Sequence, residues 1–369
     1  MRILYDHQAF SLQSYGGITR IFSEIIRYLN TQPEIATDLL LGFSGTKANF
    51  QTIISPPGRL IQQGTALFSP GVLNYAVNEL ISFALGPALG KYDIYHSTYH
   101  RFVASIRARS RVATHHDCAP EMFPDLFRNT NHIVRLKRKL FRAADLIICV
   151  SEASRVDLLR FYDVAEHKAI VIHNGVEPMV RSPGGDAELR AAISGEFLLH
   201  VGARHSYKNF DRFLRSYFMS GVSTSYKILA LGGGPPSAEH ATLIQKLGLT
   251  DRVVFVPHAS GALLAEAYAS AALLVYPSLY EGFGMPPLEA ASQGCVALVS
   301  ENPATIEVCG DAAFFFKPSD LEDFSHMLRT ALTSSAERRI FVERAQKLLK
   351  RYTWEACGRK TLDAYLRLQ

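Results

Sequence analysis

Short apolar segments alternate with amphipathic ones along this chain, and no other feature of the sequence limits its fold as much. Residues 2–5 have the length and apolarity of a buried strand, and residues 18–29 place apolar side chains at helical spacing. Repetition of strand and helix is typical of parallel sheets with helices on both faces. The first half predicts further strands at residues 93–96, 111–114, 146–150 and 169–172, and helices at residues 130–143 and 152–162.

A second series of strands and helices follows a change in composition near the middle of the chain. Residues 178–187 are rich in proline and glycine and show no periodicity, which indicates a linker. We therefore predict an α/β fold with two Rossmann-like, doubly wound parallel-sheet domains facing an interdomain cleft. The domains would cover residues 1–177 and 191–352, with a linker over residues 178–190. Strands of the second series are expected at residues 197–201, 226–231, 253–256, 273–276 and 296–299.

The composition is that of an ordinary globular protein, with 369 residues of which 48% are hydrophobic. The net charge of +5 is mild, and aromatic and basic residues do not interleave, so no nucleic-acid partner is expected. Five widely spaced cysteines without a CxxC pair argue against a disulfide framework and fit a reducing cytoplasm. The chain does not start like a signal peptide, and prolines and polar residues interrupt its most apolar window, residues 68–90. We expect a cytoplasmic protein.

Two glutamates, Glu281 and Glu289, lie eight residues apart just after the strand expected at residues 273–276. A helix cannot run from one to the other, because Gly284 and the Pro286-Pro287 pair interrupt it. Glu281 is therefore expected on a loop, and Glu289 in the first turn of a helix that starts at the prolines. Glu289 could complement the helix dipole, a reading that leaves Glu281 without a role. Alternatively, both carboxylates could accept hydrogen bonds from ligand hydroxyls.

Cations and glycines follow other expected strands. Arg204 and Lys208 come after the strand at residues 197–201 and before a helix, a favourable place to bind a diphosphate, although simple surface charge is an alternative. Gly232 to Gly234 follow the next strand, and Gly16-Gly17 precede the first amphipathic helix. Glycines there allow close approach of the backbone to a ligand, or merely a tight turn.

The run His115-His116-Asp117 ends the strand expected around residues 111–114. A metal site is one interpretation, but adjacent histidines in a strand point to opposite faces, which disfavours it. All of these groups are expected at the carboxyl ends of strands, where doubly wound sheets bind ligands. Cations for phosphate, acids for hydroxyls and glycines for close approach together suit a sugar nucleotide.

The segment PSLYEGFGMPPLEA, with Glu281 and Glu289 separated by seven residues, resembles the E-x7-E signature of retaining glycosyltransferases of family 4, which have the GT-B fold. The resemblance covers nearly the whole chain and is most similar to bacterial enzymes that build O-antigen or capsular polysaccharide, many of them mannosyltransferases. The other motifs that carry it are YGGITRIFSEIIRYL, HHD, VSEASRVDLLRFY, IHNGV, VGARHSYKNF and ATIEVCGDAAFFFKPSD.

The resemblance implies roles for residues of the second domain. Glu289 would hold the ribose hydroxyls of the nucleotide, and Glu281 would contact hydroxyls of the donor sugar. Backbone N–H groups of Phe283, Gly284 and Met285 would bind the same sugar or its phosphate. The diphosphate and its developing charge would be stabilised by two cations, Arg204 and Lys208.

The resemblance also implies roles for the first domain and for the end of the chain. Gly17 would lie against the donor phosphates, His116 would reach the donor sugar, and Asp117 would contact the acceptor. The last helix, within residues 353–369, would return to pack on the first domain.

The resemblance implies transfer of a hexose, with mannose from GDP-mannose as the first candidate, to a hydroxyl of a lipid-linked surface polysaccharide. No cofactor or metal is expected, because cations and helix N-termini would neutralise the diphosphate and the sequence has no DxD motif. Two alternatives stay open, namely a sugar-nucleotide epimerase on the same fold and a non-catalytic binding subunit.

Residues 130–143 form a basic amphipathic segment, in which apolar residues alternate with Arg135, Lys137, Arg138, Lys139 and Arg142. Such a segment can lie on an anionic membrane, and a lipid-linked acceptor would give a reason for it. An ordinary helix with a solvated basic face is the alternative.

Overall fold

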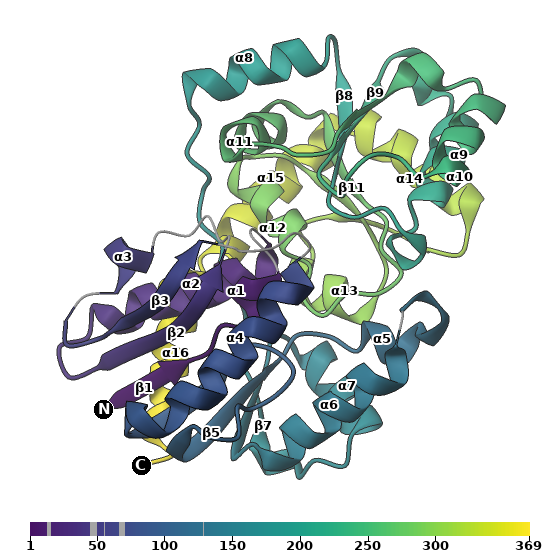
Figure 1. The fold of residues 1–369 in the computed structure, drawn as a ribbon. Coiled ribbons are helices and arrows are strands. Elements are labelled where there is room, and N and C mark those ends of the chain that lie inside the picture. The colour runs from purple at the N-terminus through teal and green to yellow at the C-terminus, as the bar shows by residue number, and fades with distance from the viewer. Residues whose placement is uncertain (13–15, 45–49, 55, 66–70, 128) are drawn as a thin grey trace. The chain divides into compact units, whose positions relative to one another are not determined.

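The chain folds into two compact units (Figure 1). A computed structural model describes all residues except 13–15, 45–49, 55, 66–70 and 128. The first unit comprises Met1–Gly175 together with Tyr352–Gln369, and the second comprises Val176–Arg351.

A seven-stranded sheet with the order β3-β2-β1-β4-β5-β6-β7 forms the centre of the first unit, and all its paired strands are parallel. The strand order reverses between β1 and β4, so their carboxyl ends mark the switch point of this sheet. The strands are β1 (Arg2–Tyr5), β2 (Ala36–Ser44), β3 (Leu60–Thr65), β4 (Lys91–Ser97), β5 (Arg107–His115), β6 (Leu146–Cys149) and β7 (Ala169–Val171).

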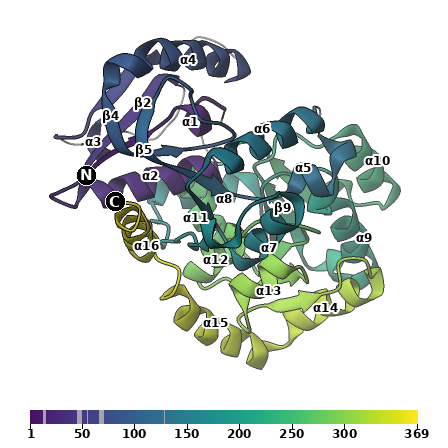
Figure 2. The same cartoon turned by 90° about the horizontal axis from the view of Figure 1, so that it is seen from below.

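Helices cover both faces of this sheet. The connections β3 to β4 and β5 to β6 step in one direction across the sheet, whereas β1 to β2 steps in the other. Right-handed crossovers therefore place α4 and α6 on one face and α2 on the opposite face, as Figures 1 and 2 show for α4 and α2. The helices are α1 (Gln8–Leu12), α2 (Gly17–Asn30), α3 (Phe50–Ile53), α4 (Gly71–Leu85), α5 (Ala119–Met122), α6 (Thr130–Ala143), α7 (Glu152–Phe161) and α16 (Trp354–Leu366).

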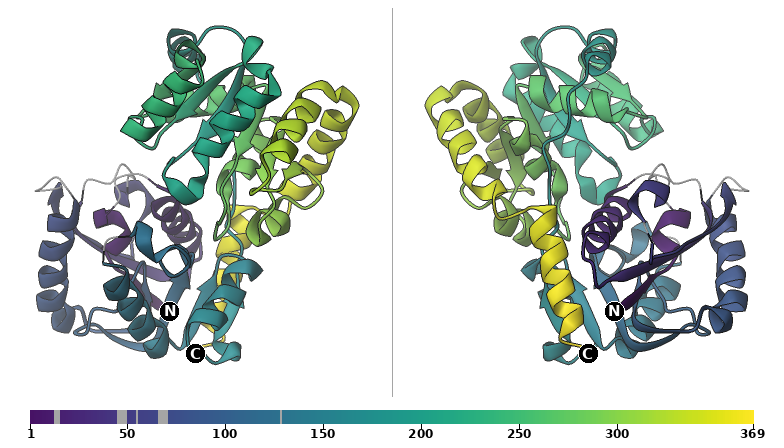
Figure 3. Two further views of the ribbon diagram at one scale, coloured as in Figure 1. Left: turned by 90° about the vertical axis from the view of Figure 1, so that its right-hand side faces the viewer. Right: turned by 90° about the vertical axis from the view of Figure 1, so that its left-hand side faces the viewer.

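The C-terminal helix α16 lies along the first unit (Figure 3) and packs on α2. Gly358 permits this packing, because a Cβ atom there would lie 2.3 Å from the ring of Tyr28. Tyr365 reaches the sheet, where its hydroxyl lies 2.6 Å from that of Tyr5 and also contacts His96 Nδ1 at 2.5 Å. The end of the chain is thus tied to β1 and β4 through buried polar contacts.

The second unit is built on a six-stranded parallel sheet with the order β10-β9-β8-β11-β12-β13. Its switch point lies between β8 and β11. Aromatic side chains fill its core, and the rings of Phe316 and Phe324 stack with centroids 3.7 Å apart. The strands are β8 (Phe197–Val201), β9 (Lys227–Leu231), β10 (Val253–Val256), β11 (Leu273–Tyr276), β12 (Ala297–Ser300) and β13 (Phe314–Phe316). The helices are α8 (Pro183–Ala192), α9 (Phe210–Ser220), α10 (Ala238–Lys246), α11 (Gly261–Ser270), α12 (Met285–Ser292), α13 (Pro303–Cys309), α14 (Leu321–Thr333) and α15 (Ser335–Leu349).

The two doubly wound parallel sheets predicted from the alternation are confirmed. The predicted linker over residues 178–190 is wrong in its second half, because α8 begins at Pro183. Pro183 suits the first helical position. Ala187, Leu189 and Arg190 are good helix formers, so the helix tolerates Gly184 and Gly185 in its first turn.

Within the described residues, every helix is either too short or too polar to cross a bilayer. The apolar window at residues 68–90 lies partly outside the described residues, and its described part contains α4.

Candidate functional site

The carboxyl ends of β8 and β11 bring Lys208 and Glu281 together at the switch point of the second sheet. Lys208 Nζ donates to Glu281 Oε1 at 2.7 Å across 73 residues of sequence. Both side chains are largely buried, with 19% and 11% of their surface exposed. An ion pair at this edge lies where doubly wound sheets bind their ligands.

Backbone geometry holds these two loops in register. Residues Ser206–Lys208 form one turn of 3-10 helix, and Asn209 then takes a left-handed conformation with φ of 58° before α9 begins. Leu279 N donates to Tyr207 O at 2.8 Å, which ties the loop after β11 to the loop after β8. The contact between Lys208 and Glu281 is therefore supported by the main chain.

Gly284 terminates the loop that carries Glu281 and caps α12. Its φ of +86° is a left-handed conformation that favours glycine. Phe283 and Met285, two further predicted donor-binding positions, flank it at the helix start. Backbone N–H groups at a helix N-terminus are suitable donors to an anionic or hydroxyl oxygen. Burial raises the pKa of nearby Tyr276 well above its usual value, and the Glu281 carboxylate adds to the effect.

Glu289 does not lie in the first helical turn, so that prediction is wrong. The helix α12 already begins at Met285, because Gly284 rather than the Pro-Pro pair sets its start, and Glu289 is its fifth residue. Its side chain is buried, and Oε2 accepts a hydrogen bond of 2.9 Å from the hydroxyl of Tyr268 on α11. The helix dipole consequently explains Glu289 less well than the sequence suggested.

Arg204 connects the loop after β8 to the glycine run after β9. Its guanidinium donates to the carbonyl oxygens of Gly232 and Gly234 and lies 5.1 Å from the ring centroid of Phe255. The residue is 4% exposed, and burial lowers the pKa of Arg204. Within the described part of the chain, the buried Nε of Arg204 has no hydrogen-bond partner.

The glycine run owes its composition to this arrangement. Gly232, Gly233 and Gly234 all have positive φ, and a Cβ atom on Gly233 would lie 2.4 Å from the carbonyl oxygen of Gly202. The run after β9 and the loop after β8 are thus in close backbone contact at the edge of the sheet.

In the first unit, Gly17 is the first residue of α2, and Arg20 N donates to Gly16 O at 3.0 Å. Part of the predicted loop before it, residues 13–15, lies outside the described residues.

The adjacent histidines of the His-His-Asp run face opposite sides of the first sheet, as the strand geometry predicts. His115 packs against Phe141 of α6, whereas His116 packs against Phe22 of α2. Burial lowers the pKa of His116, with Asp117 opposing the shift, so the ring is neutral at pH 7. Among the described residues, no cluster of three or more His, Cys, Asp or Glu side chains could hold a metal ion.

A buried lysine holds the loop that carries Asp117. Lys137 Nζ donates to Asp117 O at 2.8 Å and lies 2.6 Å from Glu121 Oε1, and both side chains are at most 5% exposed. Asp117 Oδ1 accepts from Ala119 N at 2.9 Å. Lys137 was predicted as part of a basic surface on residues 130–143, and this assignment is wrong because the side chain points inward.

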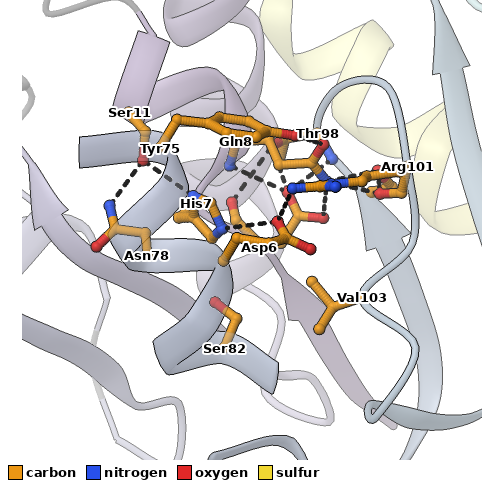
Figure 4. A network of polar contacts seen from close by, with 12 residues as sticks. Asp6, His7, Gln8, Ser11, Tyr75, Asn78, Ser82, Thr98, Arg101 and Val103 are labelled. Atoms are coloured by element: carbon orange, nitrogen blue, oxygen red, sulfur yellow. Dashed lines mark hydrogen bonds and ion pairs between the residues drawn. The ribbon is translucent and has the colours of Figure 1, made fainter. Parts of the chain in front are cut away.

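A polar network at the switch point of the first sheet was not predicted from the sequence (Figure 4). Asp6, just after β1, accepts hydrogen bonds from Tyr95 at 2.8 Å, Thr98 at 2.6 Å and Gln8 at 2.7 Å. The signal that could have found it is the polar triplet Asp6-His7-Gln8 directly after a buried strand.

Two family profiles match this chain in succession. The profile described as Glycosyltransferase Family 4 matches residues 15–179, and the profile described as Glycosyl transferases group 1 matches residues 187–348. The chain belongs to the glycosyltransferases that these two profiles describe. The resemblance noted in the sequence is therefore confirmed, and the predicted donor-side residues of this glycosyltransferase lie within the group 1 match, except Gly17 and His116.

Comparisons with individual relatives and with a solved structure are consistent with this family. The chain is 26% identical over 284 residues to the O-antigen chain mannosyltransferase B of Escherichia coli, an alignment that covers 74% of each protein. It is 28% identical over 225 residues to the O-antigen chain mannosyltransferase RfbU of Salmonella typhimurium, covering 60% of each. Among solved structures, Alr3699/HepE of Anabaena in complex with UDP and glucose matches with a TM-score of 0.76 and 18% identity, over all of both chains. The predicted GT-B fold is confirmed.

Proposed function

We propose that this glycosyltransferase moves a hexose from a nucleoside diphosphate to a hydroxyl of a lipid-linked surface polysaccharide, with retention at the anomeric carbon. Mannose from GDP-mannose is the first candidate, because the relatives described above are named mannosyltransferases. The observation that carries the proposal is the Lys208–Glu281 pair at the β8/β11 switch point.

In this proposal, the donor lies along the carboxyl edge of the second sheet. Lys208 turns from Glu281 to the diphosphate and stabilises the charge that develops on the leaving group. Glu281 then accepts from donor-sugar hydroxyls, and the N–H groups of Phe283, Gly284 and Met285 bind the same sugar or its phosphate. The buried carboxylate of Glu289 accepts from the ribose hydroxyls.

Arg204 acts with Lys208 in stabilising the diphosphate. Because its guanidinium holds the glycine run, it also sets the backbone that the phosphates approach. We propose that these two cations and the helix N-termini neutralise the diphosphate without a metal ion.

From the first unit, Gly17 offers a backbone N–H to the donor phosphates, His116 contacts the donor sugar, and Asp117 contacts the acceptor. The acceptor oxygen attacks from the same face that the diphosphate leaves. The bond between the anomeric carbon and the phosphate oxygen breaks, the bond to the acceptor oxygen forms, and the acceptor proton passes to the leaving diphosphate. A neutral His116 is compatible with hydrogen bonding to a sugar hydroxyl.

The test is transfer by the full chain, with GDP-mannose and UDP-glucose compared as donors and a lipid-linked glycan as acceptor. Lys208→Ala and Glu281→Ala are expected to lower kcat/KM by roughly a hundredfold or more, whereas Arg190→Ala, which removes an exposed pair with Asp186, leaves it unchanged. NMR of the product reports whether the anomeric configuration is retained, and excess chelator should not slow the reaction. Full activity of either site variant would overturn the assignment. Conversion of the donor sugar without an acceptor would indicate an epimerase instead.

We further propose that the protein acts at the cytoplasmic face of a membrane, which it contacts through α6. The exposed basic side chains of this helix follow helical spacing, so they form one stripe that can lie on anionic headgroups. They are Arg135, Arg138, Lys139 and Arg142.

A further inference from the structure

The crossover helix α4 has its polarity reversed. Of the α4 side chains that the structure describes, all the exposed ones are apolar, namely Leu73, Ala76, Leu80, Phe83 and Ala84. The side chains buried against the protein are polar, namely Asn74, Asn78 and Ser82. A helix on the surface of a water-soluble protein normally shows the opposite arrangement.

Specific hydrogen bonds fix this orientation. Asn78 on α4 binds both the backbone N–H and the carbonyl of Phe43, each at 2.7 Å, and also donates to Ser11 at 2.8 Å. Tyr75 donates to Gln8 at 3.0 Å. Figure 4 shows Tyr75, Asn78 and Ser82 pointing toward the residues that follow β1. Because the polar side is bonded to the sheet, rotation of the helix cannot bury its apolar side.

An ion cluster adds to the attachment. Glu79 lies 3.0 Å from Arg101 and 3.5 Å from His7, and the Arg101 guanidinium lies 5.2 Å from the ring centroid of Tyr75. The outward side of the helix is correspondingly open, since Leu80 is 73% exposed, Phe83 58% and Leu73 51%. Their spacing of three and seven residues aligns these side chains in one apolar stripe along the helix.

The size of the face argues against a second copy of this chain as its partner. A helix of 15 residues is about 22 Å long and about 10 Å wide, so one face offers on the order of 200 Å². A stable protein interface buries about 800 Å² on each partner. A helix that lies in a lipid interface has no such threshold, because its affinity adds to that of other contacts.

Basic side chains on the same face of the first unit favour an anionic lipid surface as the partner of α4. The helices α4 and α6 cover the same face of the first sheet, as the crossover directions require. This face therefore carries the apolar side of α4 and the basic stripe of α6. Apolar insertion combined with basic side chains is the pattern that binds a bilayer with anionic headgroups.

We propose that α4 is an interfacial membrane helix, with Leu73, Leu80 and Phe83 inserted at the boundary between headgroups and acyl chains. This inference rests on the proposed membrane contact of α6. It adds to that contact the apolar side chains of α4. The catalytic groups of the proposed function play no part in it.

The test is sedimentation of the full chain with vesicles of phosphatidylcholine, alone or mixed with phosphatidylglycerol. Leu80→Gln with Phe83→Gln should lower partitioning onto mixed vesicles roughly tenfold or more, at low and high salt alike. The matched control is Phe218→Gln with Met219→Gln on α9, where two apolar side chains are about half exposed, and it should bind like the unchanged protein. Neutralising the α6 stripe should remove only the salt-sensitive part of binding.

Leu80→Trp provides a second measurement of membrane insertion, which does not depend on loss of binding. Brominated acyl chains should quench this tryptophan, whereas the native Trp354, which is 4% exposed, should be quenched little. Absence of quenching, or wild-type binding by the glutamine double variant, overturns the proposal. So does light scattering that shows a dimer which the same variant dissociates.

Turnover of a water-soluble acceptor analogue separates this inference from the proposed function. The α4 variant should keep that turnover while losing vesicle binding. A protein that binds vesicles through α4 but transfers no sugar would disprove the proposed function and leave the membrane helix standing.

Discussion

Lys208 Nζ lies 2.7 Å from Glu281 Oε1 in an ion pair, although both side chains are expected to contact the donor. A diphosphate that binds Lys208 must therefore compete with the Glu281 carboxylate, and it also meets repulsion from that carboxylate. We therefore expect the pair to position Lys208 and to lower the affinity for the nucleotide.

Glu281→Gln should separate these two effects. Without the negative charge, we expect the free nucleoside diphosphate to bind roughly fivefold tighter, equivalent to about 1 kcal/mol. Transfer should nevertheless fall roughly a hundredfold, because the donor sugar loses its charged acceptor. Calorimetric titration with GDP and UDP measures the first effect, and initial rates measure the second. Asp186→Asn, in an exposed pair with Arg190, is the control. Weaker nucleotide binding by Glu281→Gln would show that the two groups do not compete.

Gly284→Ala should impair donor binding beyond its effect on stability. The left-handed φ of +86° makes any side chain unfavourable by about 1–2 kcal/mol, and relief of this strain would move the N–H groups at the start of α12. Gly294, at the other end of α12, has φ of +77° with open space around its Cβ position. Gly294→Ala should therefore lower the melting temperature similarly while donor KM stays constant. Equal donor KM values for both variants would contradict the role of the Gly284 backbone.

The strands β8 to β12 of the second sheet were predicted because they are short, mostly apolar and followed by glycine, proline or polar residues, whereas β13 was missed. The predicted bounds of β8, β10 and β11 match the structure. In the first sheet, β2 was missed because its apolar run is interrupted at Gly42, where the pairing with β3 shifts register. The helix α4 was missed because its apolar side faces outward and its polar side inward.

The candidate site was predictable as a set of strand ends, but its contacts were not. The order of strands in a sheet decides which ends are neighbours, and local patterns do not encode that order. The Lys208–Glu281 pair depends on β8 lying beside β11, and the bond from Tyr268 to Glu289 depends on the packing of α11 on α12. Periodicity alone assigned Lys137 to the basic side of its helix, because it cannot register an acidic partner, here Glu121, on another segment.

Lys137→Met should destabilise the first unit strongly. It leaves Glu121 buried at 3% exposure without its cation, a change that typically costs 3–5 kcal/mol. The double variant Lys137→Met with Glu121→Leu should recover much of this loss, because apolar side chains can replace a buried pair. Urea unfolding measures both. The control is Lys139→Met, which is exposed two residues away and should change stability by less than about 0.5 kcal/mol. Equal effects of Lys137→Met and Lys139→Met would mean that the Lys137–Glu121 pair contributes nothing to the free energy of unfolding.

Acid should destabilise this protein through its buried histidines, of which His200 is the clearest case in the second unit. Burial lowers the pKa of His200 from its usual 6.5 to about 4, and the nearby Arg204 charge adds to the effect. The unfolded chain therefore binds a proton that the folded protein excludes, so stability rises with pH across this window. The contribution, on the order of 3 kcal/mol, is complete above pH 6.5 and is lost as the pH falls toward about 4.

His200→Phe should flatten that pH dependence in the second unit, because a phenyl ring fits among Phe210 and Phe213 and takes up no proton. Melting temperatures at about pH 7 and about pH 5 measure the change, and the variant should show the smaller drop. His258→Gln is the control, since His258 is exposed and its replacement should leave the drop as it is. An unchanged drop in His200→Phe would assign the acid sensitivity to His96 and His100 of the first unit, whose pKa values burial lowers to about 3.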